Sequence, residues 1–87
     1  MDAADGRTLV LLGKPDCHLC HEMRDAIRPV LASLGLELVE RDVRDDPELS
    51  RRYILSIPVL LHGTREIVRH RVTSDELRAR LRDLGLA

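Results

Sequence analysis

The chain has 87 residues, of which 44% are hydrophobic and 33% are charged, and its formal net charge is −1. This length accommodates one domain, which we place at residues 1–87, and the composition is typical of a folded globular protein. The near-neutral charge provides no strong attraction to nucleic acid or to membranes. Tyr53 is the only aromatic residue, which further disfavours a nucleic-acid site built on stacked bases.

The first half of the chain predicts a strand, a helix and a second strand. A continuous apolar run at residues 8–12 predicts a strand that is buried on both faces. Apolar residues recur at spacings of three and four over residues 17–34, which predicts a helix capped by Gly35. Pro29 is expected to kink this helix or to end its regular part. Alternation over residues 36–43 predicts a second strand, parallel to the first.

The second half predicts a short helix, two strands and a final helix. The short helix is expected at residues 47–53, where Pro stands at the first helical position. Strands are expected at residues 58–62 and 66–70, joined as a hairpin. Thr73 and Glu76 form a capping box that opens the last helix. The order βαβαββα predicts an α/β fold, with one mixed four-stranded sheet and helices on both faces.

Cys17 and Cys20 form a C-x-x-C motif that follows a predicted strand and opens a predicted helix. The unpaired N–H groups and the dipole of a helix N-terminus favour thiolate over thiol, and Lys14 and protonated His18 would add positive charge. Cys20 lies one turn further along the helix and should be more buried. We therefore predict that Cys17 attacks a substrate disulfide and that Cys20 then attacks Cys17, which releases the reduced substrate.

Other interpretations use the same cysteine pair. The two cysteines can be core residues on one helical turn, or the pair can belong to an interaction domain that has lost turnover. Together with His21, the motif also fits the C-x-x-C-H pattern of c-type haem attachment, although that chemistry needs a mostly helical pocket and export. Finally, the pair can bind zinc or share an iron–sulfur cluster between two chains with the help of one histidine. The candidate histidines are His18, His21, His62 and His70.

Cellular location and assembly are also predicted from the sequence. Residues 1–6 lack the basic and apolar regions of a secretory signal, and no apolar run is long enough to span a bilayer. We therefore expect a cytoplasmic protein, in a compartment that keeps thiols reduced. Nothing in the sequence requires more than a monomer, and we expect no resident metal or cofactor.

Pro58 follows Ile57 at the start of the predicted third strand. A residue without a backbone N–H is tolerated at this position, so a simple strand start accounts for it. A cis peptide bond between the two residues would instead present the Ile57 backbone to an extended substrate beside the cysteines. Cis bonds make up only about 5–6% of X–Pro bonds in folded proteins, so the residues alone do not predict one.

Together, these segments resemble the glutaredoxin family. Residues 14–20, KPDCHLC, are similar to the family's K-P-x-C-P-Y-C active-site segment, and residues 56–59, SIPV, are similar to its T-V-P-x segment, which contains a cis proline. The resemblance implies a thioredoxin-like fold, thiol–disulfide oxidoreductase activity and a cis peptide bond before Pro58. It also implies that Cys17 is the nucleophile and that Cys20 is the resolving thiol.

The resemblance further implies a substrate site for protein disulfides or glutathione-mixed disulfides, with glutathione as a candidate reductant. Lys14 and the backbone of Ile57 would contact the glutathione moiety, and Ser74 and Asp75 would cap its γ-glutamyl end. The expected substrate-binding residues are Lys14, His18, Ile57, Pro58, Ser74 and Asp75.

The chain also departs from the family pattern. His18 and Leu19 stand where the family has Pro-Tyr, and residues 69–72, RHRV, replace the Gly-Gly that precedes its last helix. These changes crowd the glutathione site and alter its charge. They favour a glutaredoxin-like branch that does not use glutathione well.

Overall fold

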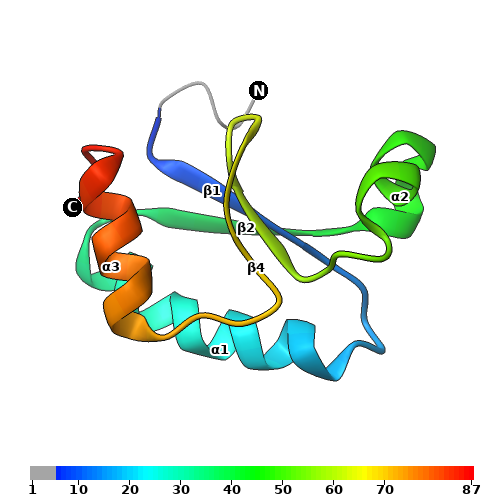
Figure 1. The fold of residues 1–87 in the computed structure, drawn as a ribbon, viewed down its shortest axis with the longest axis horizontal. Helices are drawn as coiled ribbons and strands as arrows, with labels where there is room; N and C mark the ends of the chain where they lie inside the picture. The colour runs from blue at the N-terminus through cyan, green and yellow to red at the C-terminus, as the bar shows by residue number, and fades with distance from the viewer. Residues whose placement is uncertain (1–5) are drawn as a thin grey trace.

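A computed structural model describes residues 6–87 (Figure 1). Its strands are β1 (Thr8–Gly13), β2 (Glu37–Asp42), β3 (Val59–His62) and β4 (Arg65–Arg69). Its helices are α1 (His18–Ser33), α2 (Pro47–Tyr53) and α3 (Ser74–Asp83), and a short 3-10 helix, η2 (Val43–Asp45), precedes α2. The predicted order of helices and strands is therefore confirmed. The predicted lack of a secretory signal concerns residues 1–6, of which residues 1–5 lie outside the described residues.

The four strands of the described chain form one mixed sheet in the order β2-β1-β3-β4. β1 is parallel to β2, as expected for two strands joined by a crossover helix, and antiparallel to β3. β3 and β4 form the predicted antiparallel hairpin, with an irregularity between Leu60 and Leu61. This arrangement places β1 and β3 inside the sheet, so the residues at their ends are enclosed by neighbouring strands.

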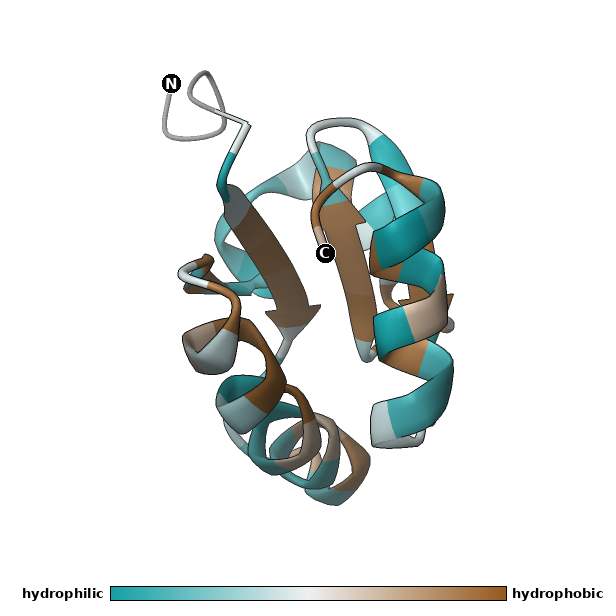
Figure 2. Cartoon of the chain, turned by 90° about the vertical axis from the view of Figure 1, so that its left-hand side faces the viewer, coloured by the Kyte–Doolittle hydropathy of each residue, from teal (hydrophilic) through white to brown (hydrophobic). Residues whose placement is uncertain are grey.

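Alternating side chains of the sheet fill two hydrophobic cores, one on each face. Leu9, Leu11 and Leu60 belong to the core beneath α1 and α3. Val10 and Leu12 point to the opposite face, where they pack in the core that α2 helps to cover. Figure 2 shows strands that are hydrophobic along most of their length, and helices that carry both hydrophilic and hydrophobic residues. The predicted α/β fold with helices on both faces is confirmed.

Pro29 does not end the regular part of α1, because the helix continues through it to Ser33; that part of the prediction is wrong. A proline inside a helix costs about 3 kcal/mol through its lost hydrogen bond and its steric clash. Val30 and Leu31, the next two residues, are only 2% and 1% exposed. Burial of each such side chain contributes about 1.5–3 kcal/mol, which offsets the cost of the proline. Gly35 follows the helix with φ 69°, as its predicted capping role requires.

The ends of the hairpin strands differ from their predicted bounds by one residue. β3 begins at Val59 rather than Pro58, because Pro58 has no N–H to contribute to the sheet. β4 covers Arg65–Arg69 rather than residues 66–70. His70 leaves the strand because its backbone adopts a left-handed conformation with φ 67°.

The capping box at the start of α3 is confirmed, and its contribution to stability can be measured. The Thr73 hydroxyl accepts a hydrogen bond from the Glu76 N–H at 3.1 Å, and the Glu76 carboxylate accepts one from the Thr73 N–H at 3.1 Å. We expect Thr73→Ala to lower the free energy of unfolding by about 1 kcal/mol in urea denaturation. Thr73→Ser keeps the hydroxyl and should retain most of this stability. Equal losses in the two variants would contradict the capping explanation.

Candidate functional site

Cys17 and Cys20 form a disulfide at the start of α1, with their Cα atoms 5.2 Å apart. Cys17 is the N-cap residue, and its Sγ accepts a hydrogen bond from the Cys20 N–H at 3.2 Å. That N–H is one of the donors that a helix leaves unpaired at its N-terminus. Among the described residues of the first helical turn, no side chain is acidic. The position therefore favours negative charge on the Cys17 sulfur once the disulfide is reduced.

The two cysteines differ in burial. Cys20 is 5% exposed, whereas Cys17 is half-buried. Gly13, the last residue of β1, lies against Cys20: a Cβ on Gly13 would stand 2.9 Å from the Cys20 Sγ and 3.1 Å from its Cβ. A glycine is required here because any side chain would press on the buried sulfur. Nothing in the local sequence around Gly13 indicates this contact, which only the close approach in space reveals.

The peptide bond between Ile57 and Pro58 is cis, as the resemblance implied. The carbonyl of Pro58 accepts a hydrogen bond from the His70 N–H at 2.7 Å, and Arg69 Nη1 donates one to Ser56 Oγ at 3.1 Å. The end of β4 is therefore hydrogen-bonded to residues on both sides of the Ile57–Pro58 peptide. His70 occupies a left-handed backbone conformation just before the segment that leads into α3, where the resemblance would have placed glycine.

Strand register brings this segment to the cysteines. The antiparallel pairing of β1 and β3 sets Leu12 opposite Val59, so Pro58 and Gly13 lie at the same end of the sheet. α1 begins at that end as well, directly after the loop that follows β1. Strand register thus places the Ile57–Pro58 segment at the same end of the sheet as the start of α1.

Lys14 and His18 flank the cysteines, but each also has an acidic neighbour. The Lys14 ammonium lies 4.0 Å from the Asp16 carboxylate, and His18 Nε2 lies 2.8 Å from the Glu22 carboxylate. The His18 side chain is 85% exposed. The positive charge that the sequence suggested around Cys17 is therefore partly balanced by carboxylates whose positions depend on the helix and loop geometry.

Because its ring nitrogen already contacts the Glu22 carboxylate and its side chain is mostly exposed, His18 is expected to have little influence on Cys17. Interactions between exposed charges contribute about 0–1 kcal/mol, which corresponds to less than about 0.7 of a pH unit. We therefore expect His18→Leu to shift the pH midpoint of Cys17 alkylation by less than that amount. The measurement is the alkylation rate of the reduced variant and of the unmodified protein across pH. A shift larger than one unit would demonstrate direct contact between His18 and the thiolate.

Ser74 and Asp75 are exposed residues in the first turn of α3. A pocket of about 370 Å³ lies nearby, between α1 and the segment that leads into α3. Neither Ser74 nor Asp75 lines it, so their contact with glutathione stays a prediction. The lining residues are Glu22, Met23, Ala26, His70, Arg71, Val72, Thr73 and Glu76.

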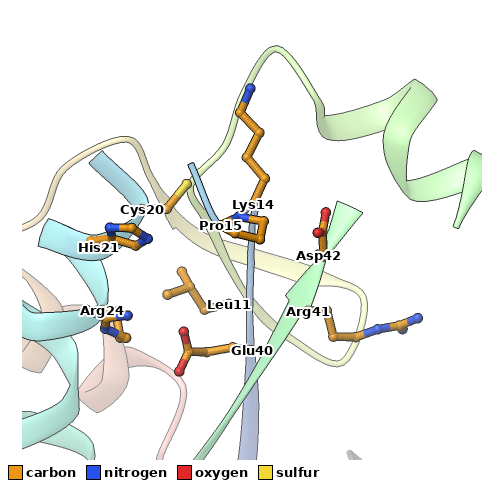
Figure 3. A pocket seen from close by; sticks show the side chains of 10 residues that line it. Leu11, Lys14, Pro15, Cys20, His21, Arg24, Glu40, Arg41 and Asp42 are labelled. Carbon is orange, nitrogen blue, oxygen red and sulfur yellow. The ribbon is translucent and has the colours of Figure 1, made fainter. Parts of the chain in front are cut away.

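A second pocket, of about 360 Å³, lies beside Cys20 between α1, the end of β1 and the edge strand β2 (Figure 3). In Figure 3, His21 and Arg24 lie on the α1 side of Leu11, and Arg41 and Asp42 lie on the β2 side. The sequence identified His21 only as a candidate haem or metal ligand and gave no sign of this pocket. Its lining residues are Leu11, Gly13, Lys14, Pro15, Cys20, His21, Arg24, Glu40, Arg41 and Asp42.

Two ion pairs set the charge near the site. Hydrogen bonds from Arg44 hold the pKa of Asp42 below its usual value, and a hydrogen bond from Arg69 lowers the pKa of Glu66 in the same way.

Residues 6–87 contain no cluster of three or more His, Cys, Asp or Glu side chains that could hold a metal ion. Within the same range, no helix has the length and apolar character needed to cross a membrane.

Solved structures are similar to the chain over most of its length. Protein Ne2328 from Nitrosomonas europaea is 30% identical with a TM-score of 0.71, and the match covers 85% of this chain and 89% of that one. Protein XcR50 from X. campestris is 31% identical with a TM-score of 0.65, over 86% and 96% of the two chains. Thioredoxin 1 from Thermosipho africanus TCF52B is 18% identical with a TM-score of 0.60, over 91% and 96%, and this likeness establishes the fold alone.

No curated protein matches the chain. Residues 8–82, however, match the family described as Glutaredoxin-like domain (DUF836). That match takes in both cysteines, the Ile57–Pro58 segment and most of α3. The chain therefore belongs to the Glutaredoxin-like domain (DUF836) family and has a thioredoxin fold with a Cys17–Cys20 pair at disulfide distance.

Proposed function

We propose that the protein is a thiol–disulfide oxidoreductase that reduces disulfides in other proteins through Cys17 and Cys20. One observation carries this proposal: Cys17 is half-buried and its Sγ accepts a hydrogen bond from the Cys20 N–H at the helix N-terminus, while Cys20 itself is almost fully buried. An accessible stabilised thiolate and a sheltered second thiol are what two-step exchange requires. Such chemistry suits a reducing compartment such as the cytoplasm.

The proposed reaction passes two electrons from the cysteine pair to the substrate. The Cys17 thiolate bonds to one sulfur of the substrate disulfide, whose S–S bond breaks, and the departing thiolate takes up a proton from solvent. Cys20 then gives up its proton and attacks the Cys17 sulfur. The Cys17–Cys20 disulfide forms, and the second substrate sulfur leaves as a thiol. An external thiol must then reduce the disulfide before the next cycle.

Protein disulfides fit the site better than glutathione-mixed disulfides do. The pocket between α1 and the segment before α3 is lined by His70 and Arg71 but also by Glu22 and Glu76. This balance of charge offers little net attraction to the two carboxylates of glutathione. We assign Lys14, His18, Ser74 and Asp75 to the margin of the substrate site.

The backbone around Ile57 supports the docking of an extended peptide. The Ile57 N–H is already bonded to the Tyr53 carbonyl at 3.1 Å. A backbone N–H of a peptide substrate would therefore donate a hydrogen bond to the Ile57 carbonyl. This carbonyl lies beside Pro58, at the end of the sheet where α1 begins. This carbonyl is the contact we assign to Ile57 in the substrate complex.

Alkylation of the reduced protein across pH, with the modified cysteine identified by peptide mass, tests the proposal. We expect Cys17 to react first, with a midpoint near or below neutral pH, and Cys20 to lag behind. Reaction of both thiols at or above the free-cysteine pKa of about 8.5 would contradict the assigned roles. As a second readout, the protein should acquire a reversible intramolecular disulfide while it reduces a protein disulfide.

A further inference from the structure

We propose that His21 accepts the proton of the Cys20 thiol, through a water molecule in the pocket beside Cys20, when Cys20 attacks the mixed disulfide on Cys17. The inference rests on the proposed function and deepens it. The second step of that reaction requires the Cys20 thiol to lose its proton inside a sheltered site, and His21 supplies the group that takes it.

Cys20 needs a proton acceptor because the features that favour a thiolate at Cys17 do not extend to it. Cys20 is 5% exposed, and burial disfavours the charged form of a thiol. Its own backbone N–H donates to the Cys17 Sγ at 3.2 Å, so this donor at the helix terminus stabilises the other sulfur. Even a free thiol, with a pKa of about 8.5, is only about 3% ionised at pH 7. A nearby base would therefore accelerate the attack by Cys20.

The pocket beside Cys20 has room for water between this thiol and a base. Cys20 contributes to its lining, although only a small part of the Cys20 surface is exposed and Gly13 crowds the sulfur from the β1 side. The pocket volume is about 360 Å³, whereas a water molecule takes up about 30 Å³ of the liquid. One bridging water is enough for proton transfer between two groups that do not touch. The sulfur thus stays sheltered from substrates while its proton has a way out.

His21 is the base of this pocket whose ring is free to act. It follows Cys20 directly on α1 and lines the same pocket, where Figure 3 shows its ring beside Cys20. Among residues 6–87, the ring has no hydrogen-bond or ion-pair partner. One ring nitrogen of a neutral imidazole accepts a hydrogen bond, so it can receive a proton from water. Histidine is also the side chain whose charge changes between about pH 5 and 8, which suits it to this task.

The other charged residues of the lining are weaker acceptors. Glu40 is paired with Arg28 at 2.7 Å, and Asp42 is paired with Arg44 at 2.8 Å. Hydrogen bonds from Arg44 hold the pKa of Asp42 below its usual value, which makes this carboxylate a poor base. The remaining charged residues of the lining are cations, which do not take up a further proton: Lys14, Arg24 and Arg41.

The charges closest to His21 along the chain are also balanced. One turn further along α1, Arg24 is paired with Asp25 at 3.2 Å. One turn earlier, His18 contacts the Glu22 carboxylate at 2.8 Å. In the loop before α1, the Lys14 ammonium lies 4.0 Å from the Asp16 carboxylate. The imidazole therefore meets no unpaired charge from these segments that would fix it in one protonation state.

The step balances in atoms and electrons. The proton of the Cys20 thiol passes through the bridging water to the neutral His21 ring. The Cys20 thiolate bonds to the Cys17 sulfur, the bond between Cys17 and the substrate breaks, and the substrate sulfur leaves as a thiolate that takes up a proton from solvent. His21 then releases its proton to solvent. The two electrons still pass from the cysteine pair to the substrate, and His21 transfers only a proton.

The test follows the second step by itself. Reduced protein is mixed rapidly with one equivalent of dithiobis(nitrobenzoate), which releases one coloured thiolate when Cys17 attacks it and another when Cys20 attacks the mixed disulfide. We expect His21→Gln to slow the second release roughly tenfold at neutral pH, and to affect the first release much less. His62→Gln is the matched control, because His62 lies at the other end of β3 and outside the pocket. It should leave both rates unchanged.

The pH profile separates proton transfer from a merely structural role of His21. In the unmodified protein, the rate of the second release should rise between about pH 5 and 8 and rise again as the thiol itself ionises. His21→Gln should keep only the second rise. Equal slowing of both releases, or persistence of the first rise in His21→Gln, would overturn the inference. Failure of the proposed function gives a different result: both releases would still occur and depend on His21, but protein disulfides would stay oxidised.

Discussion

Cys20→Ser is expected to stop exchange after its first step and to leave the substrate attached to Cys17, whereas Cys17→Ser is expected to lose exchange altogether. Without Cys20, no second thiol can attack the mixed disulfide. Without Cys17, the remaining thiol is 5% exposed and lies beyond the stabilised helix terminus. Serine preserves the size and the hydrogen-bonding capacity of each side chain, so the comparison isolates the sulfur chemistry.

The measurement is capture of substrate proteins on each variant, followed by release with a reducing agent. Cys20→Ser should retain partners that the reducing agent releases, and Cys17→Ser should retain none. The Cys17→Ser/Cys20→Ser double variant is the matched control for binding without covalent capture. If Cys17→Ser captured the same proteins as Cys20→Ser, the assignment of Cys17 as nucleophile would be wrong. If the double variant did so, the protein would be an interaction domain rather than an exchange enzyme.

Gly13→Ala is expected to destabilise the protein by about 1–3 kcal/mol, because the new methyl group would overpack the site beneath Cys20. The added carbon would lie 2.9 Å from the Cys20 Sγ, which is closer than side-chain atoms tolerate. Gly13 is not among the glycines with positive φ, so the shortage of space, rather than backbone strain, determines the effect. Equilibrium urea denaturation of the oxidised protein measures the loss.

A double-mutant cycle provides the control for this prediction. In a Cys20→Ala background the 2.9 Å contact with the sulfur is absent, whereas the 3.1 Å contact with the Cβ remains, so the loss caused by Gly13→Ala should become smaller without disappearing. Because Cys20→Ala also removes the disulfide, Gly13→Ala is compared with its own Cys20→Ala parent. An equal loss in both backgrounds would show that the Cys20 sulfur is not the cause.

The sequence by itself determined the order of the secondary structure and the position of the cysteine pair. Apolar periodicity defines β1 and α1, and a proline after an N-cap residue defines the start of α2, because these signals depend on residues a few positions apart. The capping box of Thr73 and Glu76 is local for the same reason. The C-x-x-C motif likewise placed Cys17 at the start of a helix, and the structure shows it as the N-cap residue of α1.

The sequence predicted the positively charged residues beside Cys17 but not the ion pairs that they form. Lys14 and His18 were expected to lend positive charge to Cys17, and both do lie beside it in the chain. Their acidic neighbours, Asp16 and Glu22, were equally visible in the sequence. Whether such side chains meet depends on rotamers and on local backbone geometry. Residue spacing allows the contact but does not determine it.

Only the tertiary structure decided the close contacts that shape the site. The approach of Gly13 to Cys20 and the hydrogen bond from His70 to Pro58 join segments whose proximity depends on strand register and on the packing of α1 over the sheet. The continuation of α1 past Pro29 depends in the same way on the core beneath the helix. Local sequence signals report the conformation of a few residues, whereas register and packing are settled by the burial of the whole sheet.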